Sequence, residues 1–109
     1  MIDLVLVTHP DPVAARNLIE RLVGEHLIAC GHLLPSGASV FFWEGEVRTA
    51  DEVLLVLKSV VENREILERE IRKFHPYSVP EILFLSIDHG NADYLAWVRD
   101  SCSGRPGKE

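Results

Sequence analysis

The chain has 109 residues, of which 47% are hydrophobic and 26% are charged, a balance typical of one soluble globular domain. Its formal net charge of −6 argues against a nucleic-acid-binding surface, which depends on clustered lysine and arginine. Residues 1–7 lack the pattern of a signal peptide, and no stretch approaches the roughly 20 apolar residues of a membrane span. We therefore expect a cytoplasmic protein with neither nucleic acid nor membrane as a partner.

The first predicted elements are a strand and a helix. Residues 2–8 carry an unbroken apolar run that predicts a central strand covered on both faces. Asp11 followed by Pro12 is a helix start, because the aspartate can cap the helix and proline suits its first position. Apolar residues then recur at three-to-four spacing until Gly24, which predicts an amphipathic helix.

A long hairpin follows the first helix. Residues 27–34 predict a second strand, which residues 35–37 interrupt or bulge before it resumes at 38–43. A glycine-bearing turn at 44–46 leads into the next strand, which is most apolar at 53–58. This hairpin is longer than a small sheet needs. Its overhang exposes three aromatic residues unless another chain covers them: Phe41, Phe42 and Trp43.

The second half begins with a helix. Ser59 and Glu62 have the spacing of a capping box, so we expect a helix from there to about Phe74. Two prolines in residues 75–81 make a rigid junction into a buried strand at 82–87.

The chain ends in a third helix and a tail. Asn91 is expected to cap this helix, with Tyr94, Leu95, Trp97 and Val98 facing inward. Residues 1–101 then form one domain, and residues 102–109 are expected to form a flexible C-terminal tail. The order of strands and helices predicts an α+β, ferredoxin-like split βαβ fold with one further helix.

Cysteine and histidine are the candidate metal ligands. Cys30 and Cys102 form no metal-type pair or disulfide framework, which fits a reducing compartment, with one buried thiol and one tail thiol. Five histidines show no metal-type spacing, but Cys30 and His32 lie on one side of a strand. Together they offer a thiolate and an imidazole for copper(I) or zinc, with ordinary packing as the alternative.

Enzymatic interpretations have little support. An acylphosphatase site needs an arginine in the loop after the first strand, and residues 8–11 contain none. RNA recognition on this fold needs aromatic, basic central strands, which residues 2–8 do not provide. A hydrolase using Cys30 or His75 has no supporting motif.

Two further clusters have open interpretations. The aromatic residues 41–43 can form a subunit interface, a ligand shelf or core, and aromatic enrichment at interfaces favours the first. Lys58 can pair with a carboxylate such as Glu81 in a cleft, or extend to solvent.

Several motifs in order resemble the CutA family of divalent-cation tolerance proteins. They span nearly all of residues 2–100 and comprise residues 27–30, Trp43-Glu44-Gly45, residues 52–58, His75-Pro76-Tyr77, residues 79–82 and residues 91–97.

The resemblance implies a homotrimer similar in build to PII proteins, with a role in copper or divalent-metal tolerance and no established catalytic reaction. It implies an inter-subunit cleft for a metal ion or a small anionic ligand, around Cys30, Trp43, Lys58, His75, Tyr77 and Glu81.

The candidate metal ligands are His75, Cys30 and His32. In the copper-binding members of the family that this chain resembles, a cysteine stands in place of Val7 and a second histidine in place of Phe74. Of these three family ligands, this chain therefore keeps only His75. The alternative is a structural or interaction trimer that binds no metal directly.

Overall fold

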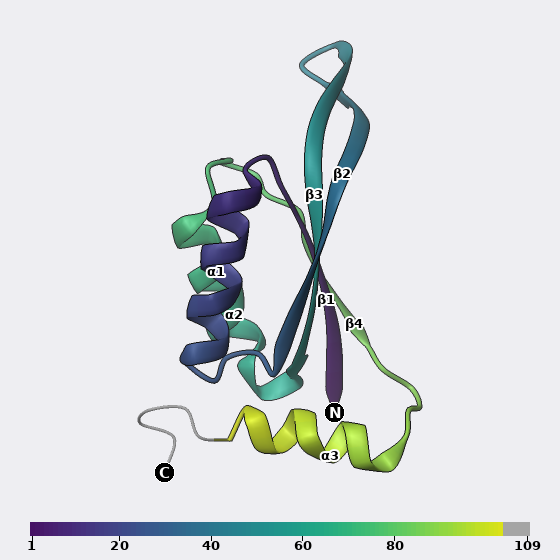
Figure 1. Cartoon of the computed structure of the whole chain (residues 1–109). Helices are drawn as coiled ribbons and strands as arrows, with labels where there is room; N and C mark the ends of the chain where they lie inside the picture. The colour runs from purple at the N-terminus through teal and green to yellow at the C-terminus, as the bar shows by residue number, and fades with distance from the viewer. Residues whose placement is uncertain (104–109) are drawn as a thin grey trace.

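The computed structural model describes residues 1–103 and contains one four-stranded antiparallel sheet in the order β2-β3-β1-β4. Its strands are β1 (Ile2–His9), β2 (Cys30–Trp43), β3 (Glu46–Val60) and β4 (Ile82–Ser86). Helices α1 (Pro12–Gly24) and α2 (Arg64–Phe74) lie on the same side of the sheet, and α3 (Ala92–Ser101) crosses one end of it (Figure 1). The predicted ferredoxin-like α+β fold is confirmed.

The start of α1 is built as its sequence predicts. The Asp11 Oδ1 atom accepts hydrogen bonds from the backbone N–H groups of Val13 and Ala14, at 2.9 and 3.2 Å, and Pro12 takes the first helical position. These bonds satisfy two of the donors that a helix N-terminus leaves free. After Gly24 the chain leaves the helix through His26, whose φ of 59° is left-handed.

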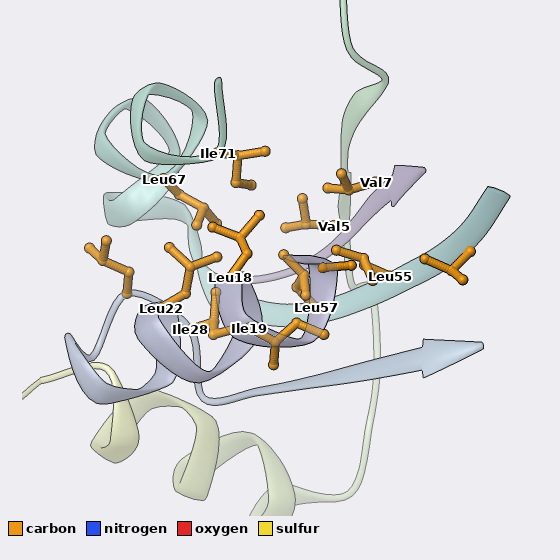
Figure 2. Close-up of a cluster of buried hydrophobic side chains, with 13 residues drawn as sticks. Val5, Val7, Leu18, Ile19, Leu22, Ile28, Leu55, Leu57, Leu67 and Ile71 are labelled. Atoms are coloured by element: carbon orange, nitrogen blue, oxygen red, sulfur yellow. The ribbon is translucent and has the colours of Figure 1, made fainter. Parts of the chain in front are cut away.

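The core lies between the two long helices and one face of the sheet (Figure 2). Alternate residues of β1 and β3 point toward the helices because side chains on a strand alternate between faces. Their partners on α1 and α2 recur at helical spacing. The labelled core residues are Val5, Val7, Leu18, Ile19, Leu22, Ile28, Leu55, Leu57, Leu67 and Ile71, and each is at most 9% exposed.

Neither α1 nor α2 covers the opposite face of the sheet, and α3 packs only against its end, where it buries Ile2 and Val60 (Figure 1). The rest of this side is called the uncovered face below. Leu6 lies opposite Val56 on one side and Leu83 on the other, and Leu83 is 52% exposed. The prediction that residues 2–8 are covered on both faces is therefore wrong for the single chain, and so is the prediction of a buried strand at 82–87. The unbroken apolar run of residues 4–7 reflects one core and one uncovered apolar surface.

The predicted hairpin overhang is confirmed. β1 pairs with β3 only over residues 53–60, so residues 46–52 of β3 extend beyond it with β2 alone. A shift of register between Leu34 and Gly37 marks the predicted bulge. Positive φ values at Glu44 and Gly45 form the turn, and the aromatic side chains near it are exposed: Phe41, Phe42 and Trp43.

The capping-box prediction is wrong because β3 continues through Ser59, whose hydroxyl donates to the Leu27 carbonyl at 2.6 Å. A short 3-10 turn, Val61–Asn63, follows before α2 begins. Arg64 then donates two hydrogen bonds to the fully buried Asp3 carboxylate, at 2.6 and 2.7 Å. This ion pair ties the first turn of α2 to β1 and neutralises a charge that would otherwise be buried alone.

The end of the chain also differs from expectation. Asn91 stands at the cap position of α3, but its side chain donates to Asp93 and not to the helix backbone. Val98 is buried as predicted, whereas Tyr94 and Trp97 are 37% and 47% exposed. Cys102 is fully buried beside Val98, so it is not a tail thiol, and Cys30 is the half-buried one. The rest of the predicted tail, 104–109, lies outside the described residues.

Candidate functional site

His75 locks the proline-rich segment onto the end of β1. Its Nε2–H donates to the Thr8 carbonyl at 2.7 Å, and its Nδ1 accepts from the Tyr77 backbone N–H at 3.1 Å. A carbonyl only accepts and a backbone N–H only donates, so these two contacts fix a neutral tautomer. Both ring nitrogens are thus used within the chain, and neither presents a free lone pair to a metal.

His9 stacks on His75 with their ring centroids 4.7 Å apart. The His9 Nδ1 accepts from the Asp11 backbone N–H at 3.0 Å, so the proton lies on Nε2. His9 is 1% exposed, and within residues 1–103 its Nε2 has no hydrogen-bond partner. Burial lowers the pKa of His9, as does electrostatic repulsion by the neighbouring His75 ring, while Asp11 and Glu52 oppose the shift.

Tyr77 reaches from the same segment to β3. Its hydroxyl donates to the Glu52 carboxylate at 2.9 Å, and Glu52 is only 9% exposed. Burial, together with the neighbouring Glu52 carboxylate, raises the pKa of Tyr77. The two side chains lie on the wall of a cavity of about 710 Å³ between the hairpin and the junction segment. Trp43, Arg48 and Glu81 also line it.

A second group of polar side chains lies on the uncovered face near α3. Cys30 on β2 is directly opposite Lys58 on β3, so the two side chains share that face. The Cys30 Sγ and Tyr94 Oη atoms are 3.4 Å apart. This hydrogen bond, with burial and the Cys30 charge, raises the pKa of Tyr94 to about 12. His32 follows two residues along β2 and is exposed on the same face.

The predicted cleft residues therefore divide into two groups within one chain. Trp43, Tyr77 and Glu81 line the cavity, and His75 lies behind the lining, where its Nδ1 accepts from the Tyr77 backbone N–H. Cys30 and Lys58 are several residues further along the sheet. Lys58 faces Leu4, whereas Glu81 precedes β4, whose first residue pairs with Val7. The suggested ion pair between Lys58 and Glu81 is absent among the residues described.

The candidate metal ligands do not form one site within the chain. Cys30 and His32 lie on the uncovered face, and His75 is committed to backbone groups at the other end of β1. No group of three or more histidine, cysteine, aspartate or glutamate side chains in residues 1–103 is arranged to hold a metal ion.

Sequence reasoning missed three residues: His9, Glu52 and Tyr94. The sequence contains a pattern that could have identified Glu52 as a site residue. Glu52 is the last acidic residue before an apolar strand and falls inside a segment that resembles the family, residues 52–58. For His9 the sequence offers no such pattern beyond its place next to Pro10, since its contact with His75 joins residues 66 positions apart in the chain. Helical spacing predicts Tyr94 as a core residue, but it is 37% exposed and contacts Cys30.

None of the helices in residues 1–103 is both long enough and apolar enough to cross a membrane.

Known proteins show the same sequence pattern and fold. Residues 3–101 match the model of the CutA1 divalent ion tolerance protein family. The divalent-cation tolerance protein CutA of Citrobacter koseri is 39% identical over 98 residues, which cover 90% of this chain and 85% of that protein. The Escherichia coli protein of the same name is 38% identical, with 90% and 88% covered.

Solved structures agree. A divalent cation tolerance protein from Thermus thermophilus has a TM-score of 0.90 at 39% identity, with 93% of this chain and 98% of that chain covered. CutA1 from Oryza sativa has a TM-score of 0.89 at 36% identity, with 92% of each chain covered. A protein of Archaeoglobus fulgidus, described as a periplasmic divalent cation tolerance protein, has a TM-score of 0.90 at 27% identity, covering 94% of this chain and 99% of its own. The chain therefore belongs to the CutA1 divalent ion tolerance protein family.

Proposed function

We propose that this protein acts as a cytoplasmic homotrimer in divalent-metal tolerance, binding copper or a related ion between subunits without catalysing a reaction. The observation that carries the proposal is the uncovered apolar face of its sheet. The relatives are named for divalent-cation tolerance, and the family resemblance implies three subunits.

The uncovered face favours assembly. Leu34, Leu83 and Leu85 on this face are 41%, 52% and 44% exposed, and they surround the half-buried central positions of β1 and β3. A contiguous apolar surface of this kind marks an interaction site, because its exposure to water is unfavourable. A domain of 109 residues also gains from burial that its own small core cannot supply.

The hairpin supports the same proposal. Residues 46–52 of β3 pair with β2 on one side and lack a β1 neighbour on the other. β2 and β4 are the two edge strands of the sheet. Free strand edges accept another strand, so copies of the chain can extend one another's sheets.

The proposed metal donors are Cys30 and His32. They share the uncovered face, and within residues 1–103 no hydrogen bond or ion pair occupies the His32 ring. A thiolate and an imidazole suit copper(I) or zinc, and a neighbouring subunit would supply the remaining donors. His75 is left out of this donor set because its two nitrogens already hold the junction segment.

Titration calorimetry with copper(I) and with zinc, under reducing conditions, tests this proposal. We expect saturable binding by the wild-type protein that is lost in a double variant, Cys30→Ser with His32→Ala. His89→Ala is the matched control, since His89 is exposed outside the sheet. Light scattering on each sample checks that the assembly is intact. Binding that survives the double variant contradicts the donor assignment.

The second candidate is a structural or interaction trimer whose effect on metal tolerance is indirect. It is favoured by the absence of a three-donor group in residues 1–103. Under this alternative, the wild-type trimer shows no saturable metal binding. The only effect of His75→Gln is then a weaker assembly.

A further inference from the structure

We propose that the cavity between the hairpin and residues 76–81 binds an organic cation, with the ligand ammonium group paired to Glu52 and its body against Phe41 and Trp43. This inference goes beyond the metal role, because none of these residues is a proposed metal donor. The observation behind it is the buried carboxylate of Glu52, which has no ion-pair partner among residues 1–103.

Glu52 is the residue that would bind the cationic group of the ligand. Its carboxylate is 9% exposed, lines the cavity and accepts a hydrogen bond from the Tyr77 hydroxyl at 2.9 Å. Among residues 1–103, no lysine, arginine or histidine forms an ion pair with it. A carboxylate withdrawn from water and left without a countercharge is costly, so a cationic ligand at this position gains more than it would in water.

The one arginine on the cavity wall does not supply that countercharge. The Arg48 Nη2 atom lies 3.4 Å from Glu44 and 3.3 Å from Glu46, so two other carboxylates neutralise it. Glu81 adds a second negative charge to the lining. The cavity is therefore negative overall, which disfavours the small anionic ligand that the family resemblance suggests.

The other walls define the ligand body. Phe41 and Trp43 are 41% and 44% exposed and line the cavity beside Tyr77. Aromatic faces attract cations, and the Tyr77 hydroxyl retains lone pairs after donating to Glu52. A volume of about 710 Å³ is that of a small-molecule site. These features together select a primary amine on an aromatic or apolar body.

Tryptamine is a suitable probe, with indole-3-propionate as its anionic counterpart. Calorimetry on the full-length wild-type protein should show saturable tryptamine binding and none for indole-3-propionate. Glu52→Gln keeps the size of the side chain and an acceptor for Tyr77, and should weaken binding at least tenfold. Asp51→Asn is the matched control, since Asp51 is exposed, lies next to Glu52 and does not line the cavity. It should leave the affinity unchanged.

Four results would overturn the inference. They are an absence of saturable tryptamine binding, tighter binding of the anion, unchanged affinity in Glu52→Gln, and zinc or copper binding that depends on Glu52. Because the comparison of the two probes uses wild-type protein, it stands even if Glu52→Gln does not fold.

The test also separates this site from the proposed assembly and metal site. Cys30→Ser with His32→Ala should keep tryptamine affinity, so loss of metal binding alone leaves the inference intact. If only a dissociated form of the protein binds tryptamine, the cavity is filled by a neighbouring subunit in the assembly, and the inference is wrong.

Discussion

The two faces of the sheet are made by the same strands yet have opposite environments. On the helix side, Val5, Val7, Leu55 and Leu57 are fully buried. On the other side, the alternate residues of the same strands are half-buried in the centre, and Leu83 and Leu85 near one edge are 52% and 44% exposed. Both faces are apolar, so the difference lies in what covers them.

This contrast assigns folding of the chain to one face of the sheet and assembly of subunits to the other. The helix side supplies the core that holds the chain together, and the open side is apolar beyond what a solvated sheet face needs. Three polar residues on the open side, Cys30, His32 and Lys58, lie together on β2 and the neighbouring part of β3. Substitutions on the two faces should therefore affect different measurable properties.

The largest effect is expected from the helix-covered face. Leu57→Ala removes a fully buried side chain that packs in the core, and should lower the free energy of unfolding by about 2–5 kcal/mol. Urea unfolding at fixed protein concentration measures this loss. A loss below about 1 kcal/mol would show that the core around β3 rearranges to fill the space.

An intermediate effect is expected from the open face. Leu83→Asp places a charge on the proposed subunit contact, which should cost about 3 kcal/mol and raise the dissociation constant of the assembly about 100-fold. Sedimentation at several concentrations measures dissociation, and circular dichroism should be unchanged. Val13→Asp is the control, because Val13 is 70% exposed on α1, away from the open face. Equal effects of the two variants would refute the contrast between the faces.

The smallest effect concerns His9, a polar residue among the buried residues of β1. Its folded-state pKa is lowered from the ordinary value of 6.5, so the unfolded chain binds the proton more readily. The contribution of His9 to stability is therefore complete above pH 6.5 and is lost as the pH falls from 6.5 toward the lowered pKa. Between pH 7.5 and 5.5, the urea midpoint of wild type should fall further than that of His9→Asn.

Asparagine can still accept the hydrogen bond from the Asp11 N–H, so this variant isolates the titration of the imidazole. His89→Asn, at an exposed position, should follow the wild-type profile. A His9→Asn profile with the same pH dependence as wild type would show that His9 does not titrate differently on folding.

Local patterns predicted much of the fold. Asp11 and Pro12 marked the start of α1, and the overhanging hairpin followed from strand length and the turn around Gly45. The uncovered face was not predicted, because a run such as residues 4–7 looks the same whether its second face meets a helix or another molecule. The capping box at Ser59 failed because a tertiary bond to Leu27 competed with local capping.

The candidate site was predicted less well for a geometric reason. The contacts that define it, His75 with Thr8, Tyr77 with Glu52 and Cys30 with Tyr94, join residues far apart in the chain. Motif spacing identifies His75 and Tyr77 but carries no information about whether a histidine nitrogen is free. The hydrogen bonds of His75 decide that question, and they assign it to the scaffold.

The mass of the wild-type protein in solution tests the central claim most directly, because that claim is that other copies of the chain cover the open face. Light scattering at micromolar concentration should give three times the 12.3 kDa of one chain, with Leu83→Asp shifted toward the single-chain mass. A wild-type mass of 12.3 kDa across the accessible concentrations would contradict it. The apolar face would then be exposed in the working protein.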